Sequence, residues 1–383
     1  MSSSPSIYLD ANATTSLDPA VIDAMTPYLT DRFGNPSSLH REGTTARDAI
    51  RVARRQTATL IGAKPAEIVF TGSGSEANNM AIRGVLESNP NIRHIVTSAV
   101  EHSSVLATCA YLKDKGYEVT RLGVDSGGAI DMAALKTALT EHASPSLVSL
   151  MWANNETGVM FPVEAIAQLT RTHDAVLHVD AVQAAGKVPI DVSRIPVDLL
   201  SLSAHKLHGP KGVGVLFIRT GVRCAPLIHG GGQENGLRSG TQNVAGIVGF
   251  GEAAKAAVAG PAIMQSHVAP LRDRLEQCLV TGIPGVTMTG TQSERLPNTC
   301  HLSIPNVEGD ALLLRLNDAG ICASAGSACS AGVMAPSHVM MAMGRNSGDS
   351  QSSARFSLSR FTTSEEIETA AEAIVEIVTE MRA

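Results

Sequence analysis

The sequence predicts an α/β protein built on a mainly parallel sheet with helices on both faces, followed by a smaller α+β domain. Short apolar runs rich in β-branched residues alternate with helical patterns between about residues 67 and 219. Such runs are typical of strands buried on both faces of a parallel sheet, and their alternation with helices favours an α/β architecture. After about residue 260 the pattern of predicted strands and helices changes. We expect a large domain over residues 15–260 and a small domain that combines residues 1–14 with 261–383.

Seven apolar runs predict the strands of the large sheet: Glu67–Phe70, His94–Thr97, Glu118–Thr120, Leu147–Met151, Val176–Val179, Leu199–Leu202 and Val213–Ile218. A helix is expected after the first strand, because Ala77, Met80, Ala81 and Val85 follow helical spacing. In the small domain we expect a helix near Leu271–Leu279, strands at Thr299–Ile304 and Arg355–Leu358, and a final amphipathic helix. The apolar face of that helix contains Ile367, Ala370, Ala371, Ile374, Ile377 and Val378. Two segments rich in glycine and serine predict mobile loops, Ala323–Gly332 and Gly344–Ser353.

Composition and charge narrow the classes of partner. The 383 residues are 44% hydrophobic and 17% charged, and the net charge of −6 is spread along the chain without a long basic stretch. This pattern argues against a nucleic-acid or membrane partner and favours small molecules and proteins. Six cysteines occur without CxxC spacing, which argues against a disulfide framework and a zinc site. We therefore expect a cytoplasmic protein with free thiols and no metal.

Lys206 is the first candidate for chemistry. The run from Leu200 to Gly214 places it directly after an apolar strand, beside hydroxyl and imidazole groups. A lysine that acts covalently must lose its proton, which requires desolvation or a cationic neighbour. Taken alone, the position is equally consistent with a solvated loop lysine.

Two other segments support a covalent role for this lysine. The segment His178–Gln183 ends another strand and contributes an acid, Asp180, and an amide, Gln183. The glycine-rich turn Thr71–Asn78 begins a helix, whose free N–H groups and the Ser75 hydroxyl would bind a phosphate. The alternative is an ordinary N-cap turn. Together the three segments suit pyridoxal phosphate, an aldehyde cofactor with one phosphate and a ring nitrogen that a carboxylate keeps protonated.

The chain resembles the NifS/IscS-type cysteine desulfurases of the class V aminotransferase group, and the NifS-like members in particular. The resemblance runs from Tyr8 to Phe361 and implies the fold type I architecture of pyridoxal-phosphate enzymes. Its motifs are Tyr8–Thr14, Gly34–Ser38, Gly72–Asn79, Glu101–Val105, Asn154–Gly158, His178–Gln183, Ser203–Gly212, Arg238–Gln242, Gly326–Ser330 and Arg355–Phe361.

The resemblance also implies roles for individual residues. Lys206 would hold the cofactor, Asp180 would pair with its ring nitrogen, and His102 would stack on the ring and act as an acid or base. The remaining cofactor contacts would come from Asn155, Gln183, Gly74, Ser75, Ser203 and His205, and from Thr241 of the other subunit of a homodimer. Asn35 and Arg355 would bind the substrate carboxylate. Without the resemblance, His102 fits a structural hydrogen-bonding role and Arg355 a surface charge on a strand.

Cys329 separates a desulfurase from a plain aminotransferase. The resemblance implies that its thiolate attacks the sulfur of L-cysteine, so that L-alanine leaves and a persulfide remains on Cys329. The sulfur would pass to a scaffold protein for iron–sulfur clusters or to another acceptor. The other cysteines are expected to pack as small hydrophobic residues: Cys109, Cys224, Cys278, Cys300 and Cys322. The end of the chain at Ala383, soon after the last helix, favours a NifS-like over an IscS-like protein. The alternatives are a selenocysteine lyase and a sulfur-relay or docking protein with little turnover.

Overall fold

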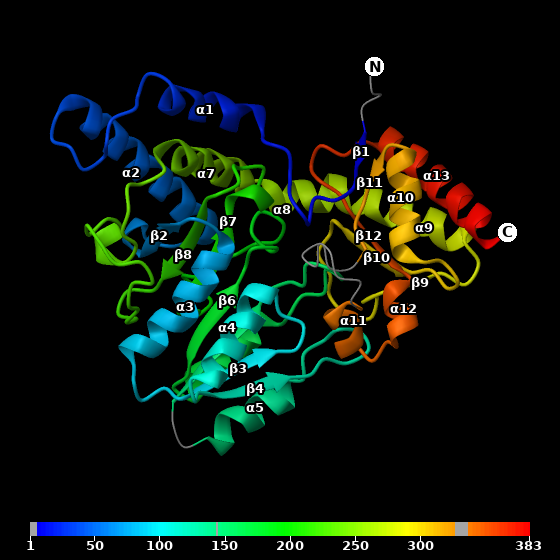
Figure 1. The fold of residues 1–383 in the computed structure, drawn as a ribbon, viewed down its shortest axis with the longest axis horizontal. Helices are drawn as coiled ribbons and strands as arrows, with labels where there is room; N and C mark the ends of the chain where they lie inside the picture. The colour runs from blue at the N-terminus through cyan, green and yellow to red at the C-terminus, as the bar shows by residue number, and fades with distance from the viewer. Residues whose placement is uncertain (1–5, 143–144, 326–335) are drawn as a thin grey trace.

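The computed structural model describes residues 6–142, 145–325 and 336–383. Figure 1 shows two bodies side by side, a larger one built around a sheet and a smaller one that contains the C-terminal third of the chain. The N-terminal strand lies in the smaller body, next to segments more than 300 residues away. The exact division at residue 260 stays a prediction.

The predicted seven-stranded, mainly parallel sheet is confirmed. Its strand order is β2-β8-β7-β6-β5-β3-β4. The pairs from β7 through β6, β5 and β3 to β4 are parallel, whereas β8 is antiparallel to both of its neighbours. The strands are β2 (Ile68–Thr71), β3 (His94–Ser98), β4 (Glu118–Leu122), β5 (Ser146–Met151), β6 (Val176–Asp180), β7 (Leu199–Ser203) and β8 (Gly214–Ile218). Because β6 and β7 run in parallel, the residues that follow them meet at one edge of the sheet.

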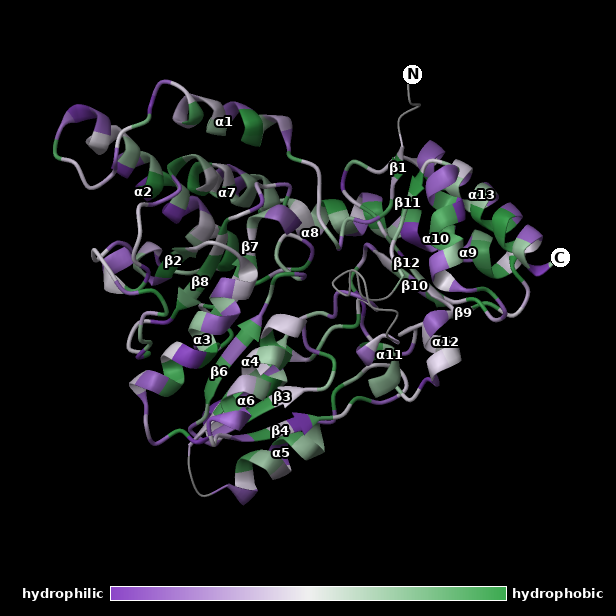
Figure 2. Ribbon diagram, viewed as in Figure 1, coloured by the Kyte–Doolittle hydropathy of each residue, from purple (hydrophilic) through white to green (hydrophobic). Residues whose placement is uncertain are grey.

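Helices cover both faces of this sheet. One apolar cluster joins the sheet to α1 (Pro19–Leu29), α2 (Arg41–Ile61), α5 (Met132–Glu141), α6 (Val163–Thr172) and α7 (Val244–Ala257). A second cluster joins the opposite face to α3 (Gly74–Ser88) and α4 (Ser103–Asp114). Figure 2 shows hydrophobic residues along the strands and hydrophilic ones on the outer faces of these helices. The alternation of buried apolar runs and helices therefore predicted the layers correctly.

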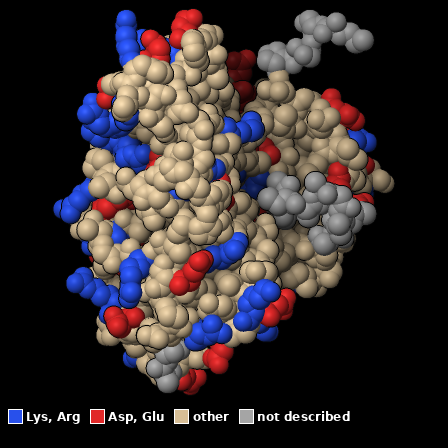
Figure 3. Space-filling model, turned by 60° about the vertical axis from the view of Figure 1, so that its left-hand side comes forward, with Lys and Arg blue, Asp and Glu red and all other residues tan. Residues whose placement is uncertain are grey.

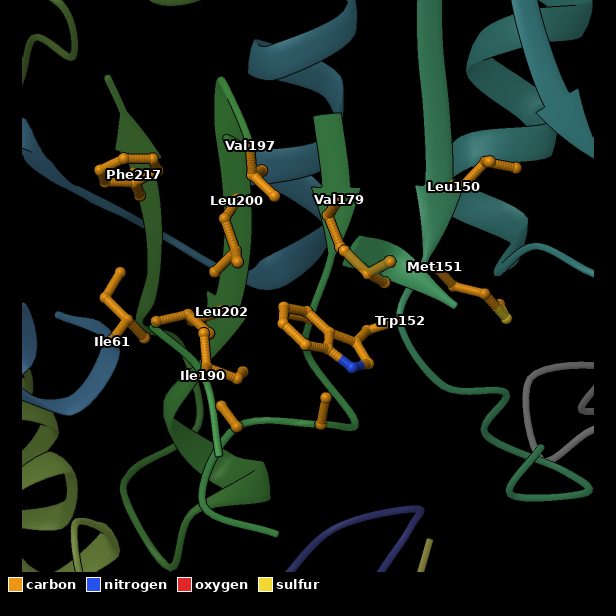
Figure 4. Packing of buried hydrophobic residues seen from close by; sticks show 14 of the residues in the cluster. Ile61, Leu150, Met151, Trp152, Val179, Ile190, Val197, Leu200, Leu202 and Phe217 are labelled. Carbon is orange, nitrogen blue, oxygen red and sulfur yellow. The ribbon is translucent and has the colours of Figure 1, made fainter. Parts of the chain in front are cut away.

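The core beneath the sheet is packed by side chains from adjacent strands. Figure 4 shows Leu150, Val179 and Leu200 pointing to the same side of the sheet, with Trp152 below them. These aliphatic side chains are at most 1% exposed. Truncating such a side chain to alanine costs about 2–5 kcal/mol, so this layer supports the strand ends that follow it.

The smaller body has its own apolar cluster, which runs from Leu9 to Val378. Its strands are β1 (Ile7–Tyr8), β9 (Thr287–Met288), β10 (Thr299–Ser303), β11 (Ile321–Cys322) and β12 (Ser353–Ser357). Its helices are α8 (Gly260–Ile263), α9 (Ala269–Gly282), α10 (Gly309–Asp318), α12 (Ser347–Gln351) and α13 (Ser364–Arg382). The short helix α11 (His338–Ala342) instead packs Val339 and Met340 into the apolar cluster of the larger body. The six residues predicted as the apolar face of α13 are its buried residues, which confirms that prediction.

One loop prediction is wrong. Gly344–Ser353 contains α12, and β12 begins at Ser353. The Ser353 hydroxyl donates to the Ser350 carbonyl oxygen, at 2.9 Å, and both serines are buried. Packing against the smaller body therefore outweighs the turn preference of glycine and serine here. The other predicted loop, Ala323–Gly332, lies outside the described residues from residue 326 onward.

Within residues 6–142, 145–325 and 336–383, no helix taken singly has both the length and the apolar composition needed to span a bilayer. One pair of consecutive helical segments has that length and composition only when the two are taken together, with a bend of 53° between Val244–Ala257 and Gly260–Gly282.

Candidate active site

A cavity of about 420 Å³ lies where the carboxyl ends of the central strands meet β12. Figure 3 shows the furrow between the two bodies, with charged side chains of both signs visible inside it. The cavity has the size of an ordinary small-molecule site. Ten of the residues predicted from the sequence line it: Gly74, Ser75, His102, Asn155, Asp180, Gln183, Ser203, His205, Lys206 and Arg355.

Lys206 reaches this cavity from the short 3-10 turn Ala204–Lys206, directly after β7. Its Nζ donates to the backbone carbonyl oxygens of Asn12, at 2.5 Å, and Ala13, at 2.6 Å. These two hydrogen bonds hold the amine at the cavity wall, against the N-terminal segment of the chain.

Asp180 is the last residue of β6 and is 7% exposed. Its Oδ2 accepts a hydrogen bond from Asn78 Nδ2, at 2.7 Å, and its Oδ1 accepts one from the Val182 N–H, at 3.0 Å. These two donors fix the plane of the carboxylate at the cavity wall. A carboxylate held in this way can keep a nearby ring nitrogen protonated.

The start of α3 forms a cradle beside Lys206. Ser73 caps the helix by accepting from the Glu76 N–H, at 3.0 Å. A Cβ added at Gly74 would lie 2.9 Å from Val182 Cγ2 and 3.3 Å from Ser203 Cβ, so only glycine leaves this space open. Free N–H groups at a helix start attract anions, and a phosphate fits this cradle.

His205 lies between the cradle and the N-terminal segment. Its pKa is lowered to about 4. Burial is the main cause, and the charges of Lys206 and Lys211 contribute. Its Nδ1 pairs with Thr14 Oγ1 at 3.2 Å. At neutral pH the ring is therefore an uncharged hydrogen-bonding group.

His102 combines the two roles considered for it. It is the N-cap of α4, because its Nδ1 accepts from the Ser104 N–H, at 3.1 Å. It also lines the cavity. The cap fixes the ring at the wall, so a structural hydrogen bond positions a side chain that faces the ligand space.

Arg355 is an internal residue of β12, and its side chain is 1% exposed. The interpretation as an exposed strand charge is therefore wrong. Its Nη2 pairs with Asp10 Oδ1 at 2.6 Å, and its Nη1 donates to the Asn155 carbonyl oxygen at 2.9 Å. The guanidinium is thus a buried, permanent positive charge at the edge of the cavity.

Two of the predicted site residues do not line this cavity. Asn35 and Thr241 are exposed and do not line it. Their neighbours Pro36, Ser37 and Gln242 line a separate surface hollow of about 380 Å³. Cys329 lies outside the described residues.

The sequence profile described as aminotransferase class-V matches residues 7–369. The chain belongs to the class-V aminotransferase family. It is 48% identical to a cysteine desulfurase of Nostoc sp., over 98% of this chain and 94% of that protein. It is 45% identical to the cysteine desulfurase NifS of Azotobacter vinelandii, over 98% of this chain and 93% of that protein. A solved structure of a NifS-like protein superposes with a TM-score of 0.91 at 38% identity, covering 98% of this chain and all of that one. The resemblance inferred from the motifs is confirmed.

The class-V aminotransferase fold brings two asparagines to the site that sequence reasoning did not single out. Asn78 positions Asp180, and it faces inward from the second turn of α3. Asn12 is 1% exposed and donates through Nδ2 to Thr299 Oγ1, at 2.9 Å, and to the Asn155 carbonyl oxygen, at 3.2 Å. Asn12 lies inside a motif used for the resemblance, but its partners are distant in sequence. No local signal reveals that role.

Behind the cavity wall, Glu101 is completely buried. Burial raises its pKa to about 8, although hydrogen bonds from Ser98 and the Met151 N–H oppose that shift. At neutral pH this family member therefore carries a neutral carboxylic acid behind Met151, which lines the cavity. In the described part of the chain, no group of three or more His, Cys, Asp and Glu side chains is arranged to hold a metal ion.

Proposed function

We propose that the protein is a pyridoxal-phosphate-dependent cysteine desulfurase, which converts L-cysteine to L-alanine and transfers the sulfur to Cys329. The observation that carries this proposal is one cavity in which Lys206, Asp180 and the start of α3 come together. Relatives that match the chain over nearly its whole length are named cysteine desulfurases, which supports the same activity.

The residues present suit the cofactor. Lys206 supplies the amine for covalent attachment and Asp180 the carboxylate for the ring nitrogen. The glycine cradle at Gly74 accommodates the phosphate, with hydroxyl groups nearby from Ser75 and Ser203. His102 would lie against the ring, and Asn155 and Gln183 would face its phenolic oxygen. When bound, pyridoxal phosphate supplies an electron sink for the substrate carbon next to the amino group.

The chain then controls substrate position and proton movement. Arg355 holds a permanent charge for the substrate carboxylate, and a guanidinium can bind it through two parallel hydrogen bonds. Once released from the cofactor, the Lys206 amine would remove the α-proton and return a proton to carbon. His102 is placed at the wall as a second acid or base.

Cys329 would accept the sulfur. Its thiolate attacks the sulfur of the bound L-cysteine, an S–S bond forms, and the bond between Cβ and sulfur breaks. The carbon product takes up protons and leaves as L-alanine, while the persulfide stays on Cys329. The cysteine lies outside the described residues, so this step rests on the family resemblance alone.

A homodimer would explain the exposed residues near Asn35. Leu29, Phe33 and Leu39 are 68%, 80% and 92% exposed. Large apolar side chains grouped on a surface indicate a protein contact. A second subunit covering this region would bring Thr241 of one subunit to the phosphate of the other. We further propose a cytoplasmic location and an iron–sulfur scaffold or another sulfur acceptor as the protein partner.

The proposal is tested by measuring L-alanine and protein persulfide after purified protein, loaded with pyridoxal phosphate, reacts with L-cysteine. Wild type should give both products, and Cys329→Ser should give no persulfide. Equal sulfur release by both proteins would show that Cys329 is not the acceptor. L-Selenocysteine serves as the second substrate, and a strong preference for it would indicate a selenocysteine lyase. Turnover that occurs only with an added acceptor protein would indicate a sulfur-relay protein.

A further inference from the structure

Lys187 is a buried lysine beside Lys206 that the mechanism above does not use. It is 5% exposed and ends the turn that follows β6. Its Nζ donates to two amide oxygens, Asn12 Oδ1 and Gln183 Oε1, each at 2.9 Å. A buried amine is costly unless its hydrogen bonds are made, so these two contacts hold the side chain in place.

The surroundings of Lys187 are positively charged. Burial lowers its pKa well below the ordinary value, and the charges of Lys206 and Arg355 lower it further. Lys187 and Lys206 also line a common cavity of about 30 Å³. The titratable and charged groups that face this pair of amines are His102, Asp180, His205, His208, Arg355 and Arg360. The two amines therefore compete for protons within one enclosed region.

The hydrogen bonds of Lys187 decide how the Gln183 amide is turned. A lysine amine offers donors, so the oxygen of the amide faces Lys187 and its NH₂ group faces the other way. That NH₂ group donates to the Asn12 carbonyl oxygen, at 2.9 Å. The same carbonyl oxygen accepts the hydrogen bond from Lys206 Nζ. Lys187 and Lys206 are thus joined through Gln183 and Asn12.

Asn12 Oδ1 accepts from Lys187 and also from Asn298 Nδ2, at 3.1 Å. Its Nδ2 donates to Asn155 and Thr299, so several partners fix the orientation of Asn12. The Gln183 oxygen accepts from Lys187. If Lys187 lost its donors, the Gln183 amide could rotate and turn its oxygen toward the Asn12 carbonyl oxygen, which has no proton to donate.

We propose that Lys187 is a positioning residue for Lys206. Its amine holds the Gln183 amide so that the Gln183 NH₂ group and Lys206 Nζ donate to the same acceptor, the Asn12 carbonyl oxygen. The inference rests on the proposed function, because it takes Lys206 as the residue that attaches the cofactor.

The test compares Lys187→Met, Gln183→Leu and the double variant, starting from cofactor-free protein. The measured quantities are the affinity for added pyridoxal phosphate, from absorbance titration, and the thermal unfolding of the cofactor-free protein. Lys187→Met should weaken binding by about tenfold, since it removes the donor that holds the buried Gln183 oxygen. Adding Lys187→Met to Gln183→Leu should cost much less than it costs in wild type, because the effect passes through Gln183. Lys255→Met, on the exposed face of α7, is the control.

A second readout is the pH at which the absorbance of the bound cofactor changes. Removing a competing amine should move that midpoint to higher pH, by about one unit. If Lys187 had only a structural role, Lys187→Met would lower the unfolding temperature without changing this pH midpoint. If Lys187→Met does not fold, Asn12→Ser removes one acceptor of Lys187 and should weaken binding in the same non-additive way.

The inference is overturned if a folded Lys187→Met protein keeps the wild-type affinity and midpoint, or if the losses from the two substitutions add. If instead wild-type protein does not bind pyridoxal phosphate, the proposed function fails and not only the role of Lys187.

Discussion

The two basic side chains at the cavity, Lys206 and Arg355, differ in their contacts and in their chemistry. Arg355 pairs with the Asp10 carboxylate at 2.6 Å, and Lys206 donates to two backbone carbonyl oxygens. A guanidinium stays charged in proteins, whereas a lysine amine becomes a nucleophile once it loses its proton. The cavity therefore contains a fixed charge suited to binding and an amine suited to covalent chemistry.

Two carboxyl groups near the cavity differ in burial and in partner. The Asp10 side chain is 15% exposed and pairs with the Arg355 guanidinium. Glu101 is completely buried and accepts hydrogen bonds from Ser98 and the Met151 N–H. Burial raises the pKa of Glu101 to about 8, which favours its neutral form.

Lys206→Arg tests the contrast between the Lys206 amine and the Arg355 guanidinium most directly, because it keeps a positive charge and removes the amine. Activity should fall by at least about a thousandfold, since arginine neither attaches the cofactor nor moves a proton at neutral pH. The measurement is the steady-state rate of L-alanine formation. Lys211→Arg, an exposed neighbour, is the control and should keep its activity. A substantial rate in Lys206→Arg would show that charge alone is sufficient.

Asp10→Asn removes the counter-ion of Arg355. The guanidinium, 1% exposed, would remain buried without a carboxylate, and the free energy of unfolding should fall by about 3 kcal/mol. Urea unfolding at neutral pH measures this change. Asp273→Asn is the matched control, because Asp273 pairs with Arg272 while being 63% exposed. Equal losses in the two variants would contradict the importance of burial.

Arg355→Lys keeps the charge and removes the planar, two-pronged donor. The KM for L-cysteine should rise by about tenfold, and kcat should change less, because the lost contact serves binding in both ground and transition states. Full kinetic curves at constant pH separate the two constants. A fall in kcat with an unchanged KM would assign Arg355 to the chemical step instead of substrate binding.

Glu101→Gln tests the neutral carboxyl. The folded protein keeps the Glu101 proton up to about pH 8, whereas the unfolded chain loses it near the ordinary glutamate pKa of 4.5. Wild-type stability from this group is therefore present at low pH and lost as the pH rises toward 8. Relative to Glu101→Gln, wild type should lose about 1 kcal/mol between pH 6 and 7. Parallel pH dependences of the unfolding free energy would show that Glu101 is ionised in the folded protein.

Much of the fold could be predicted from local pattern. The seven apolar runs became the seven strands of the large sheet, and the apolar face of α13 is buried as its spacing indicated. Periodicity works in these places because a strand or helix buries the same positions that its own geometry selects. The helix at Ser347–Gln351 was missed, because the segment is also held by a contact distant in sequence, the hydrogen bond from the Ile304 N–H to the Ser352 carbonyl oxygen.

Site residues could be predicted where a motif lies at the end of a strand. Asp180 is the last residue of β6 and Lys206 follows the adjacent parallel strand β7. Their positions therefore indicate a common edge of the sheet. The roles of Asn12 and Lys187 could not be found in this way. Asn12 contacts partners as far along the chain as Ser357. Lys187 looks like an ordinary turn lysine until the fold buries it against Asn12.

The attachment point of the cofactor tests the central claim most directly. Protein incubated with pyridoxal phosphate would be reduced with borohydride, digested and analysed by mass spectrometry. We predict that the reduced cofactor is found on the peptide that contains Lys206 and that Lys206→Arg abolishes the label. A label on Lys187 or Lys211 in wild type, with Lys206 unmodified, would contradict the assignment of Lys206 as the residue that attaches the cofactor.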